Sequence, residues 1–401
     1  MDFDMLEDLL QDEQSPPTNI KVVGVGGAGG NAINRMISSG LKKVTFVAMN
    51  TDIQALQRSN AQIRLPLGRE LTGGLGAGGI PEVGEKAAEE SREEVKQLLS
   101  GTDMVFITAG MGGGTGTGGA SVIAEIAREV NALTVAVVTT PFAFEGKKKL
   151  QLALGGIEKL RKHVDTLILI PNQYLLKVVE NNTPIKQAFL LADDVLRQGV
   201  QGISELITEP GEINIDFADV KTVMKGRGDA LMGIGNGEGD NRAIDAARAA
   251  INNPLLENAT IDGAKSVLVN LAGGDALTLQ EYQDVVELIT ENCADDALII
   301  AGQAYSPELG DKIKVTVVAT GFEAPNSEAT HQAAFESKQR RATRTFGQVP
   351  SSNPTSDDSE DEDVVTINRW QDLQQQIGNR QQSNDFNFPA VLRYKREEKE
   401  D

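Results

Sequence analysis

The sequence predicts an α/β protein in which a Rossmann-like parallel sheet and a long central helix precede a second α/β domain. Apolar, β-branched segments alternate with helical ones along the first half of the chain, which is typical of parallel sheets with right-handed crossovers. Two glycine-rich loops each follow such an apolar segment. Aromatic residues make up only 4% of the 401 residues, so the cores depend on Val, Ile, Ala and Gly, which suits layered α/β packing.

The elements of the first domain, residues 19–182, are predicted from apolar runs and from glycine positions. Residues 1–18 are acidic and contain two prolines near their end, so we expect a flexible tail. Strands are expected at Lys21–Val25, Val44–Met49, Met104–Thr108, Leu133–Thr139 and Thr166–Ile170. Helices are expected at Asn31–Ser39, closed by Gly40, and at about Ser121–Val130.

A long helix over residues 183–208 is predicted between the two domains. Thr183 is placed as its N-cap and Pro184 in its first turn, and Glu209-Pro210-Gly211 ends it. Its apolar positions recur on one helical face: Ile185, Phe189, Ala192, Leu196, Ile203 and Leu206.

The second domain, residues 209–322, is predicted from three strands and a capped helix. The strands are expected at Lys265–Leu271, Ala297–Ala304 and Ile313–Ala319. Thr278 and Glu281 have the spacing of a capping box at the start of a helix. Beyond this domain, residues 323–384 are rich in Ser, Gln, Asn and Thr, so we expect a disordered linker.

Charge and cysteine content exclude several classes of protein. The formal charge of −20 disfavours direct binding to nucleic acid or to an anionic membrane surface, because the field of the chain repels polyanions. With Cys293 as the single cysteine and only two histidines, neither a disulfide nor a zinc site is expected. There is no signal-peptide pattern and no apolar run of about 20 residues, so we expect a soluble cytoplasmic protein that does not insert into membranes.

The first glycine-rich loop, Gly24–Gly30, contains the pattern G-x-G-x-x-G between a strand and a helix. Glycine lets a phosphate approach the backbone, and the first N–H groups of the helix favour an anion. On these residues alone, close strand–helix packing and a dinucleotide fold stay open as alternatives. A dinucleotide fold, as in a nicotinamide oxidoreductase, requires an acid at the end of the second strand, where this chain has Asn50.

The second glycine-rich loop, Gly110–Gly119, is the stronger indication of a nucleotide phosphate site. Seven of its ten residues are glycine, and a plain turn does not require so large a loss of chain entropy. Its backbone N–H groups can form an anion nest, to which the hydroxyls of Thr115 and Thr117 add donors. The pattern G-x-x-x-x-G-K-[ST] occurs nowhere, so an ordinary P-loop is excluded.

Residues Gly112–Gly118 read GGGTGTG, and on this motif the chain resembles the tubulin/FtsZ superfamily and, within it, bacterial FtsZ. The resemblance extends from about Ile20 to Phe322 and includes an apolar segment near the end of the chain. It implies GTP and GDP as ligands, with Mg²⁺, and GTP hydrolysis by head-to-tail filaments in bacterial division. The GTP site that it implies comprises Gly26, Gly27, Ala28, Gly29, Gly30, Asn31, Asn50, Asp52, Gly76, Ala77, Gly78, Gly113, Gly114, Thr115, Gly116, Thr117, Gly118, Glu145, Lys149, Asn172, Phe189, Asp193 and Asp194.

Two positions of that site depend on side-chain chemistry. Lys149 stands where the family usually has Arg, and it keeps the charge but loses the bidentate fork, so a weaker contact with the γ-phosphate is expected. Asp193-Asp194 matches the family's Asn/Asp pair. A carboxylate can accept from both N1–H and the exocyclic amine of guanine, which favours GTP over ATP. Which of the two aspartates faces the base stays open.

Asn214, Asp216 and Asp219 form the pattern N-x-D-x-x-D after the long helix. On sequence alone they fit a capped turn before a helix at Val220–Met224, whereas the resemblance to FtsZ implies that they orient the attacking water. The long helix places them roughly 20 Å beyond Asp193, at ~1.5 Å per residue. We therefore expect them to act on a neighbour's nucleotide, at a heterologous junction that repeats into a filament.

An apolar segment, Phe386–Leu392, lies within the charged and polar end of the chain, residues 385–401. At the end of a linker with an r.m.s. reach of about 45 Å, such a segment is typical of a peptide that orders on a partner, although an idle terminus is the alternative. The resemblance implies that Phe386–Arg393 binds membrane-tethering division adaptors and that the protein works in a mid-cell ring. A filament for plasmid segregation is disfavoured by this segment and by the absence of a basic DNA-adaptor tail.

Overall fold

The computed structural model describes residues 18–176, 183–209, 211–253, 261, 263–291, 293–294 and 296–322, which all belong to one compact unit. The predicted N-terminal tail apart from Thr18, the linker and the docking peptide lie outside the described residues. Within the described ranges, no helix has the length and apolar character needed to cross a membrane.

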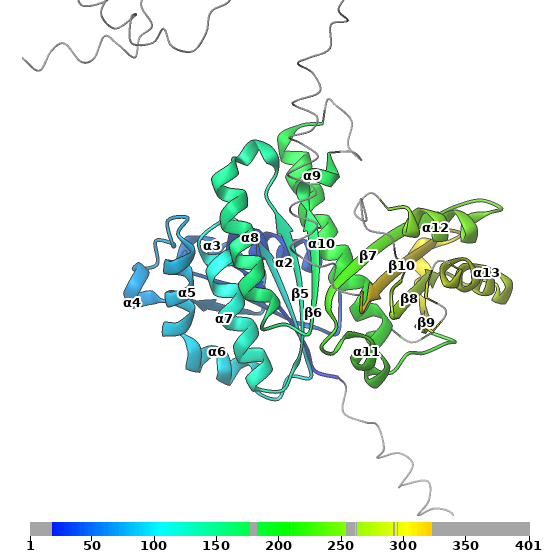
Figure 1. Ribbon diagram of the computed structural model, residues 1–401, viewed down its shortest axis with the longest axis horizontal. Coiled ribbons are helices and arrows are strands. Elements are labelled where there is room, and N and C mark those ends of the chain that lie inside the picture. The colour runs from blue at the N-terminus through cyan, green and yellow to red at the C-terminus, as the bar shows by residue number, and fades with distance from the viewer. Residues whose placement is uncertain are drawn as a thin grey trace, which may run out of the picture. The chain divides into compact units, whose positions relative to one another are not determined.

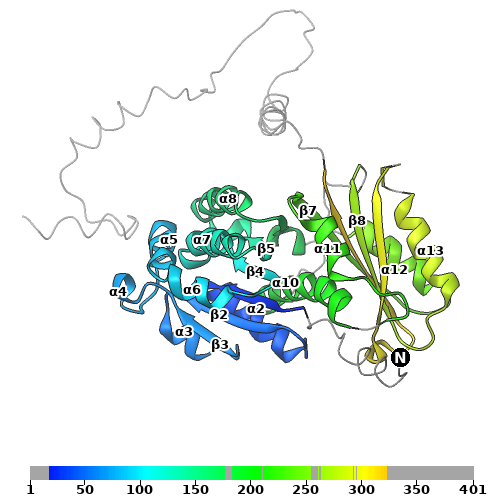
Figure 2. The ribbon, with the colours of Figure 1, turned by 90° about the horizontal axis from the view of Figure 1, so that it is seen from below.

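The described strands form one ten-stranded sheet with the order β3-β2-β1-β4-β5-β6-β7-β10-β8-β9 (Figures 1 and 2). The strands are β1 (Ile20–Val25), β2 (Thr45–Asn50), β3 (Ile63–Pro66), β4 (Met104–Gly110), β5 (Leu133–Thr140), β6 (Thr166–Pro171), β7 (Gly228–Gly237), β8 (Ser266–Gly273), β9 (Leu298–Tyr305) and β10 (Ile313–Thr320). Every strand predicted from the sequence is present, with ends within two residues of the prediction.

Strand directions confirm the parallel first half and show a mixed second half. From β3 to β7 neighbouring strands are parallel, as the alternation of strands and helices predicted. β10 runs antiparallel to both of its neighbours, β7 and β8, while β8 and β9 are parallel. β10 belongs to the second domain, for which the sequence predicted no strand direction.

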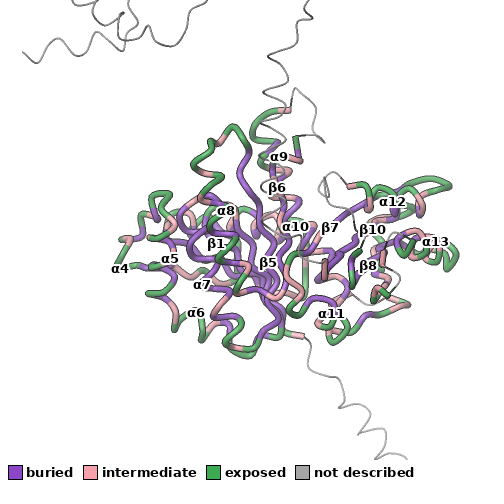
Figure 3. Tube along the Cα trace, viewed as in Figure 1, coloured by how far each residue is buried: buried purple, intermediate pink, exposed green. Residues whose placement is uncertain are grey.

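Helices cover both faces of the parallel half, which explains why its strands read as continuous apolar runs. One face packs against α2 (Gly26–Ser38), α10 (Ile185–Thr208) and α11 (Phe217–Met224). The other packs against α5 (Pro81–Glu90), α6 (Arg92–Leu99), α7 (Thr115–Glu129) and α8 (Lys147–Arg161). Figure 3 shows β1 and β5 buried between these layers.

The remaining helices are short or belong to the second half. They are α3 (Ile53–Gln57), α4 (Arg69–Thr72), α9 (Asn172–Leu175), α12 (Arg242–Ile251) and α13 (Leu279–Thr290), with short 3-10 turns at Ala143–Glu145 and Pro307–Leu309. α12 and α13 pack with β8 and β10 around a third apolar cluster. The predicted capping box at the start of α13 is confirmed, since the Thr278 side chain accepts from the Glu281 N–H and the Glu281 carboxylate accepts from the Thr278 N–H.

α10 connects the two halves of the sheet. It begins at Ile185, with Pro184 as its N-cap, so the prediction of Thr183 as N-cap is wrong by one residue. Its buried side is the predicted apolar face from Ala192 onwards, but Ile185 and Phe189 are 71% and 39% exposed. These two exposed side chains are therefore not part of the core.

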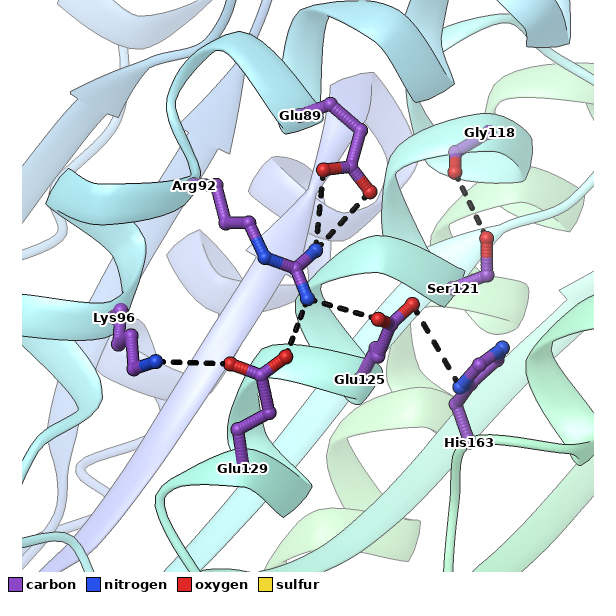
Figure 4. A network of polar contacts seen from close by, with 8 residues as sticks. All are labelled: Glu89, Arg92, Lys96, Gly118, Ser121, Glu125, Glu129 and His163. Carbon is purple, nitrogen blue, oxygen red and sulfur yellow. Dashed lines mark hydrogen bonds and ion pairs between the residues drawn. The ribbon is translucent and has the colours of Figure 1, made fainter.

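A network of ion pairs ties three helices of one face together (Figure 4). Arg92 on α6 donates to Glu89 on α5 at 3.1 Å and to Glu125 and Glu129 on α7 at 2.8 and 2.5 Å. Lys96 also donates to Glu129. Hydrogen bonds to Glu129 and Glu125 raise the pKa of Arg92 above its usual range. The network fastens α5 to α7, whose first turn belongs to the second glycine-rich loop.

Candidate nucleotide-binding site

Each glycine-rich loop runs directly into the first turn of a helix. α2 begins at Gly26 and α7 at Thr115, whereas the sequence predicted starts near Asn31 and Ser121. The low helix propensity of glycine caused this error, because propensity is a weak prior that tertiary packing overrides. Neither helix has a side-chain cap at its N-terminus, so the first N–H groups are open to an anionic ligand.

Close packing accounts for many glycines of the two loops. A Cβ atom at Gly29 would lie 2.4 Å from the carbonyl oxygen of Thr108, and one at Gly118 only 1.9 Å from that of Pro81. A Cβ at Gly116 would lie 2.8 Å from the carbonyl oxygen of Gly110. At these positions glycine allows α2 to approach β4 and α7 to approach α5.

Gly27, Gly30 and Gly113 differ, because no protein atom lies within 4 Å of the place a Cβ would take. Their backbone is also outside the left-handed region. Neither packing nor conformation therefore accounts for glycine there, and the open space would admit a ligand close to the backbone. Gly27 and Gly113 line the same cavity.

That cavity has a volume of about 260 Å³ and lies at the carboxyl ends of β1, β4 and β5, where the two loops meet. In open α/β sheets ligands bind in the crevice at this end of the strands. The side chains and backbone that line it include eleven residues of the predicted GTP site: Gly27, Ala28, Gly113, Gly114, Thr115, Gly116, Glu145, Lys149, Asn172, Phe189 and Asp193.

Two further cavities hold more of the predicted residues. One lies between α2 and α10 and is lined by Asn31, Asp194, Arg35 and Arg197, together with Asp193, which it shares with the first cavity. The other, beside the end of β2, is lined by Gly26, Gly30, Asn31 and Asn50, among others. Asp193 therefore lies between the cavity at the glycine-rich loops and the cavity between α2 and α10.

Asp193 and Asp194 have different surroundings. Burial raises the pKa of Asp193, and Arg35 at 3.4 Å opposes this shift only in part. Burial also acts to raise the pKa of Asp194, but hydrogen bonds from Arg197 at 2.6 Å and Gln198 at 2.5 Å lower it overall. Asp194 is thus engaged by its own helix, while Asp193 keeps acceptor capacity at the cavity wall.

The part of the first cavity lined by Asn172 and Phe189 combines a polar and an apolar side chain. Asn172 is buried and its Oδ1 atom has no hydrogen-bond partner among the described residues, so an acceptor is available in the cavity. Phe189 makes an edge-on contact with Phe142, with ring centroids 5.4 Å apart, and Phe144 stacks on Phe142 at 5.0 Å. A flat apolar surface next to an unpaired acceptor suits a heterocyclic base.

Lys149 is paired within the protein. Its ammonium group forms an ion pair with Glu145, one turn earlier on the chain, and the other Glu145 oxygen accepts from the Phe142 N–H at 2.9 Å. Contact between Lys149 and a phosphate would compete with this ion pair.

The structure places other predicted residues outside the three cavities. The Thr117 hydroxyl accepts from the Gly112 N–H at 2.8 Å and so holds the loop in shape. Asp52 caps α3 by accepting from the N–H groups of Gln54 and Ala55. Gly76 and Gly78 have positive φ, and the loop they form with Ala77 lies against Gly114. Gly29 and Gly118 are the packing glycines described above.

Comparison with known proteins agrees with this geometry. Residues 19–180 match the description "Tubulin/FtsZ family, GTPase domain", and residues 228–323 match "FtsZ family, C-terminal domain". The chain belongs to the FtsZ family. The GTPase domain of this family implies GTP and GDP as ligands, and the cavity at the two glycine-rich loops is the candidate site for them.

Solved FtsZ structures resemble the chain over most of its length. An empty FtsZ dimer from M. jannaschii is 46% identical, with a TM-score of 0.75 over 80% of this chain and 93% of that one. A mutant of the same FtsZ gives the same identity and TM-score over 96% of its length. A GTPγS-bound protofilament of CetZ2 from Haloferax volcanii, at 22% identity and a TM-score of 0.63, shares the fold.

The predicted catalytic residues of this FtsZ family member lie at the start of α11, outside all three cavities. Asp216 caps the helix by accepting from the Asp219 N–H at 2.8 Å, and Asp219 accepts from the Asp216 N–H at 3.4 Å. Asn214 accepts from the Gly211 N–H at 2.8 Å. These three side chains therefore form the capped turn that the sequence suggested, and all three are exposed.

The sequence did not identify several residues of the site. Arg35 pairs with Asp193 and lines the cavity between α2 and α10, and Met111 and Thr139–Pro141 line the first cavity. Arg35 lies four residues after Asn31, which places both on one face of α2. That spacing was the available signal, but Arg35 belongs to no glycine motif.

Proposed function

We propose that this FtsZ family member is a GTP-dependent, head-to-tail polymerising GTPase that forms the scaffold of the division ring in bacterial cytokinesis. The supporting observation is the separation of two sets of residues. The open glycines Gly27 and Gly113 line the nucleotide cavity, whereas Asp216 and Asp219 lie beyond the opposite end of α10. From Asp193 to Thr208 the helix alone spans roughly 22 Å, at ~1.5 Å per residue.

The nucleotide is held by groups of different kinds. The uncapped N-termini of α2 and α7 bind the phosphates through backbone N–H groups. Asp193 and Asn172 present acceptors for the N1–H and amino groups of guanine, beside the ring of Phe189. Mg²⁺, which the resemblance implies, would accompany the phosphates at this cavity, since this small cation prefers oxygen ligands. When bound, it supplies positive charge that offsets the charge of the phosphates.

Hydrolysis is completed by the next subunit. Asp216 and Asp219 orient a water molecule for attack on the γ-phosphate of the neighbouring chain, and Asn214 assists them. Because this contact joins two different surfaces, it repeats and produces a filament. The carboxylate oxygens that cap α11 are exposed on the chain, so they are accessible to a neighbour.

A mixing experiment tests the junction. One chain carries Asp219→Ala and the other carries Gly113→Asp, which places a negative charge at the phosphate wall. Each chain alone should release no phosphate from GTP, while the mixture should regain activity because the first supplies GTP and the second supplies the carboxylates. Light scattering with GTP and Mg²⁺ reports assembly in parallel. A mixture as inactive as its components would refute catalysis between subunits.

The proposed cellular role depends on the apolar segment Phe386–Leu392. Phe386–Arg393 binds membrane-tethering adaptors, and the protein is cytoplasmic and concentrates in a ring at mid-cell. The support is sequence: an apolar segment at the end of a long polar linker. Deleting Phe386–Arg393 should leave assembly with GTP unchanged and abolish ring formation in dividing cells. Rings of normal position and intensity in the deletion strain would contradict this role.

A further inference from the structure

A basic cavity lies at the end of the sheet opposite the nucleotide site. It has a volume of about 360 Å³ and is lined by Arg128, Lys221 and Lys225, together with Asn131, Ala132, Leu133 and Asp165. Leu133 begins β5 and Asp165 immediately precedes β6, so the cavity is at the amino ends of these strands. Arg128 comes from the last turn of α7, Lys221 from α11, and Lys225 is the C-cap residue of α11.

The three cations of this cavity outnumber the one carboxylate in its lining, Asp165. Arg128 donates to the carbonyl oxygen of Lys162 at 2.9 Å, and the Asp165 carboxylate accepts from the Thr134 N–H at 3.0 Å. In the part of the chain that the structure describes, neither Arg128 nor either lysine forms an ion pair with a carboxylate. Three such cations in one cavity are unexpected in a chain with 58 acidic and 38 basic residues.

The described chain begins at the same edge of the sheet. The carbonyl oxygen of Asn19 accepts from the N–H of Asp103 at 3.0 Å, and the carbonyl oxygen of Asp103 accepts from the N–H of Leu133 at 2.9 Å. β1, β4 and β5 are adjacent strands, so the start of β1 is about two strand spacings, roughly 10 Å, from the cavity wall at Leu133.

We propose that the acidic N-terminal segment, Asp2–Glu13, docks in this basic cavity of its own chain. The segment contains six carboxylates and no Lys or Arg: Asp2, Asp4, Glu7, Asp8, Asp12 and Glu13. The five residues from Glu13 to Thr18 reach up to about 17 Å when extended, which exceeds the distance to be covered. Docking links α7 to α11, the helix that Asp216 and Asp219 cap.

The tether favours this occupant over the acidic stretch 357–363 of the linker. That stretch starts 35 residues beyond Phe322, and a flexible chain of that length has an r.m.s. span of about 33 Å. A longer linker lowers the effective concentration of the acidic side chains at the cavity. The N-terminal carboxylates are therefore the closer and more concentrated partner.

Distance measurement by electron spin resonance tests the proposal in the full-length chain bound to GDP. Spin labels are attached at Leu9→Cys and at Thr222→Cys, an exposed position on α11, with Cys293→Ser to remove the native thiol. A tenfold excess of unlabelled chain suppresses distances between molecules. We expect a narrow, short distance that is lost in about 1 M salt, where the Debye length is roughly 3 Å.

Paired variants identify the partners. Lys221→Gln with Lys225→Gln should abolish the short distance, whereas Lys86→Gln with Lys42→Gln, which removes two exposed lysines elsewhere, should retain it. Neutralising Asp8, Asp12 and Glu13 should also abolish it. A broad distance distribution in the parent chain overturns the proposal, and so does a short distance that survives the α11 variant. A short distance that disappears on dilution with unlabelled chain assigns the contact to a second copy and equally overturns it.

Discussion

Gly113 and Gly118 belong to the same loop but are glycine for different reasons. Gly113→Ala should preserve the melting temperature and weaken GTP binding at least about tenfold, because the new methyl group enters the cavity without touching protein. Gly118→Ala should lower the free energy of unfolding by about 1–3 kcal/mol, because its Cβ would lie 1.9 Å from the Pro81 carbonyl oxygen.

Thermal melts without nucleotide and titrations with fluorescent GTP measure the two effects. The variants serve as controls for each other, since both add one methyl group to one loop. Normal GTP affinity in a stable Gly113→Ala chain would show that this open glycine faces no ligand.

Asp193 is expected to lower the stability of the protein at neutral pH and to increase its affinity for GTP. Burial raises its folded-state pKa, so the stability contributed by its protonated form is complete below the unfolded pKa of about 3.9 and is lost as pH rises through the raised folded pKa. Asp193→Asn removes this titration. In the absence of nucleotide, the variant should therefore gain stability relative to the parent as pH rises from 4.5 to about 7.

The same substitution, Asp193→Asn, should reduce GTP affinity roughly 10- to 100-fold. It removes the negative charge and replaces one acceptor oxygen of the carboxylate with an NH2 donor. Asp194→Asn is the matched control, since Asp194 is engaged by Arg197 and Gln198. Urea denaturation across pH and GTP titration of both variants provide the measurement. Equal losses of affinity in the two variants would contradict the assignment of Asp193 to the base.

At the scale of elements, the cap of α11 can be separated from its proposed chemistry. Asp216→Ser keeps a side-chain acceptor for the Asp219 N–H, so stability should change by less than about 0.5 kcal/mol while GTP hydrolysis is lost. Asp216→Ala should also abolish GTP hydrolysis, and in addition it should lower the free energy of unfolding by about 1 kcal/mol. Thr278→Ala at the cap of α13 should cost a similar amount and leave hydrolysis intact.

Phosphate release and urea denaturation of these three variants distinguish the two interpretations of the N-x-D-x-x-D pattern. If Asp216→Ser hydrolyses GTP normally, the capped turn is sufficient to explain the residues at this position.

The accuracy with which the sequence predicts the bounds of helices and strands also differs between elements. Strands such as β5 were located to within one residue because burial on both faces requires an unbroken apolar run. β7 was missed because its glycines interrupt the pattern. A Cβ at Gly235 would lie 1.9 Å from the carbonyl oxygen of Ala246, so α12 packs directly on the strand backbone. The start of α7 was missed for the same reason, since its glycines follow from contact with α5, which no local pattern encodes.

In the whole molecule, the nucleotide site is built by residues far apart in sequence, and this limited its prediction. The motifs that contain Gly27 and Gly113 line one cavity, because both follow strands that end at the same edge of the sheet. Arg35 meets Asp193 only after α10 packs on α2, across an interval of 158 residues. Such contacts depend on the assembled fold and leave no periodic signal.

β10, the last strand of the described residues, holds the second half of the sheet together, so the chain should tolerate truncation only beyond it. β10 lies between β7 and β8 and pairs with both along eight residues, and Phe322 packs on the apolar cluster behind it. A chain ending at Phe322 should keep its melting temperature and GTP affinity. A chain ending at Lys312 lacks β10, so β7 and β8 lose their common partner and cooperative unfolding of the second half should disappear. Calorimetry of both chains, with GTP titration, checks this, and a marked loss of stability in the chain ending at Phe322 would mean that later residues contribute to the fold.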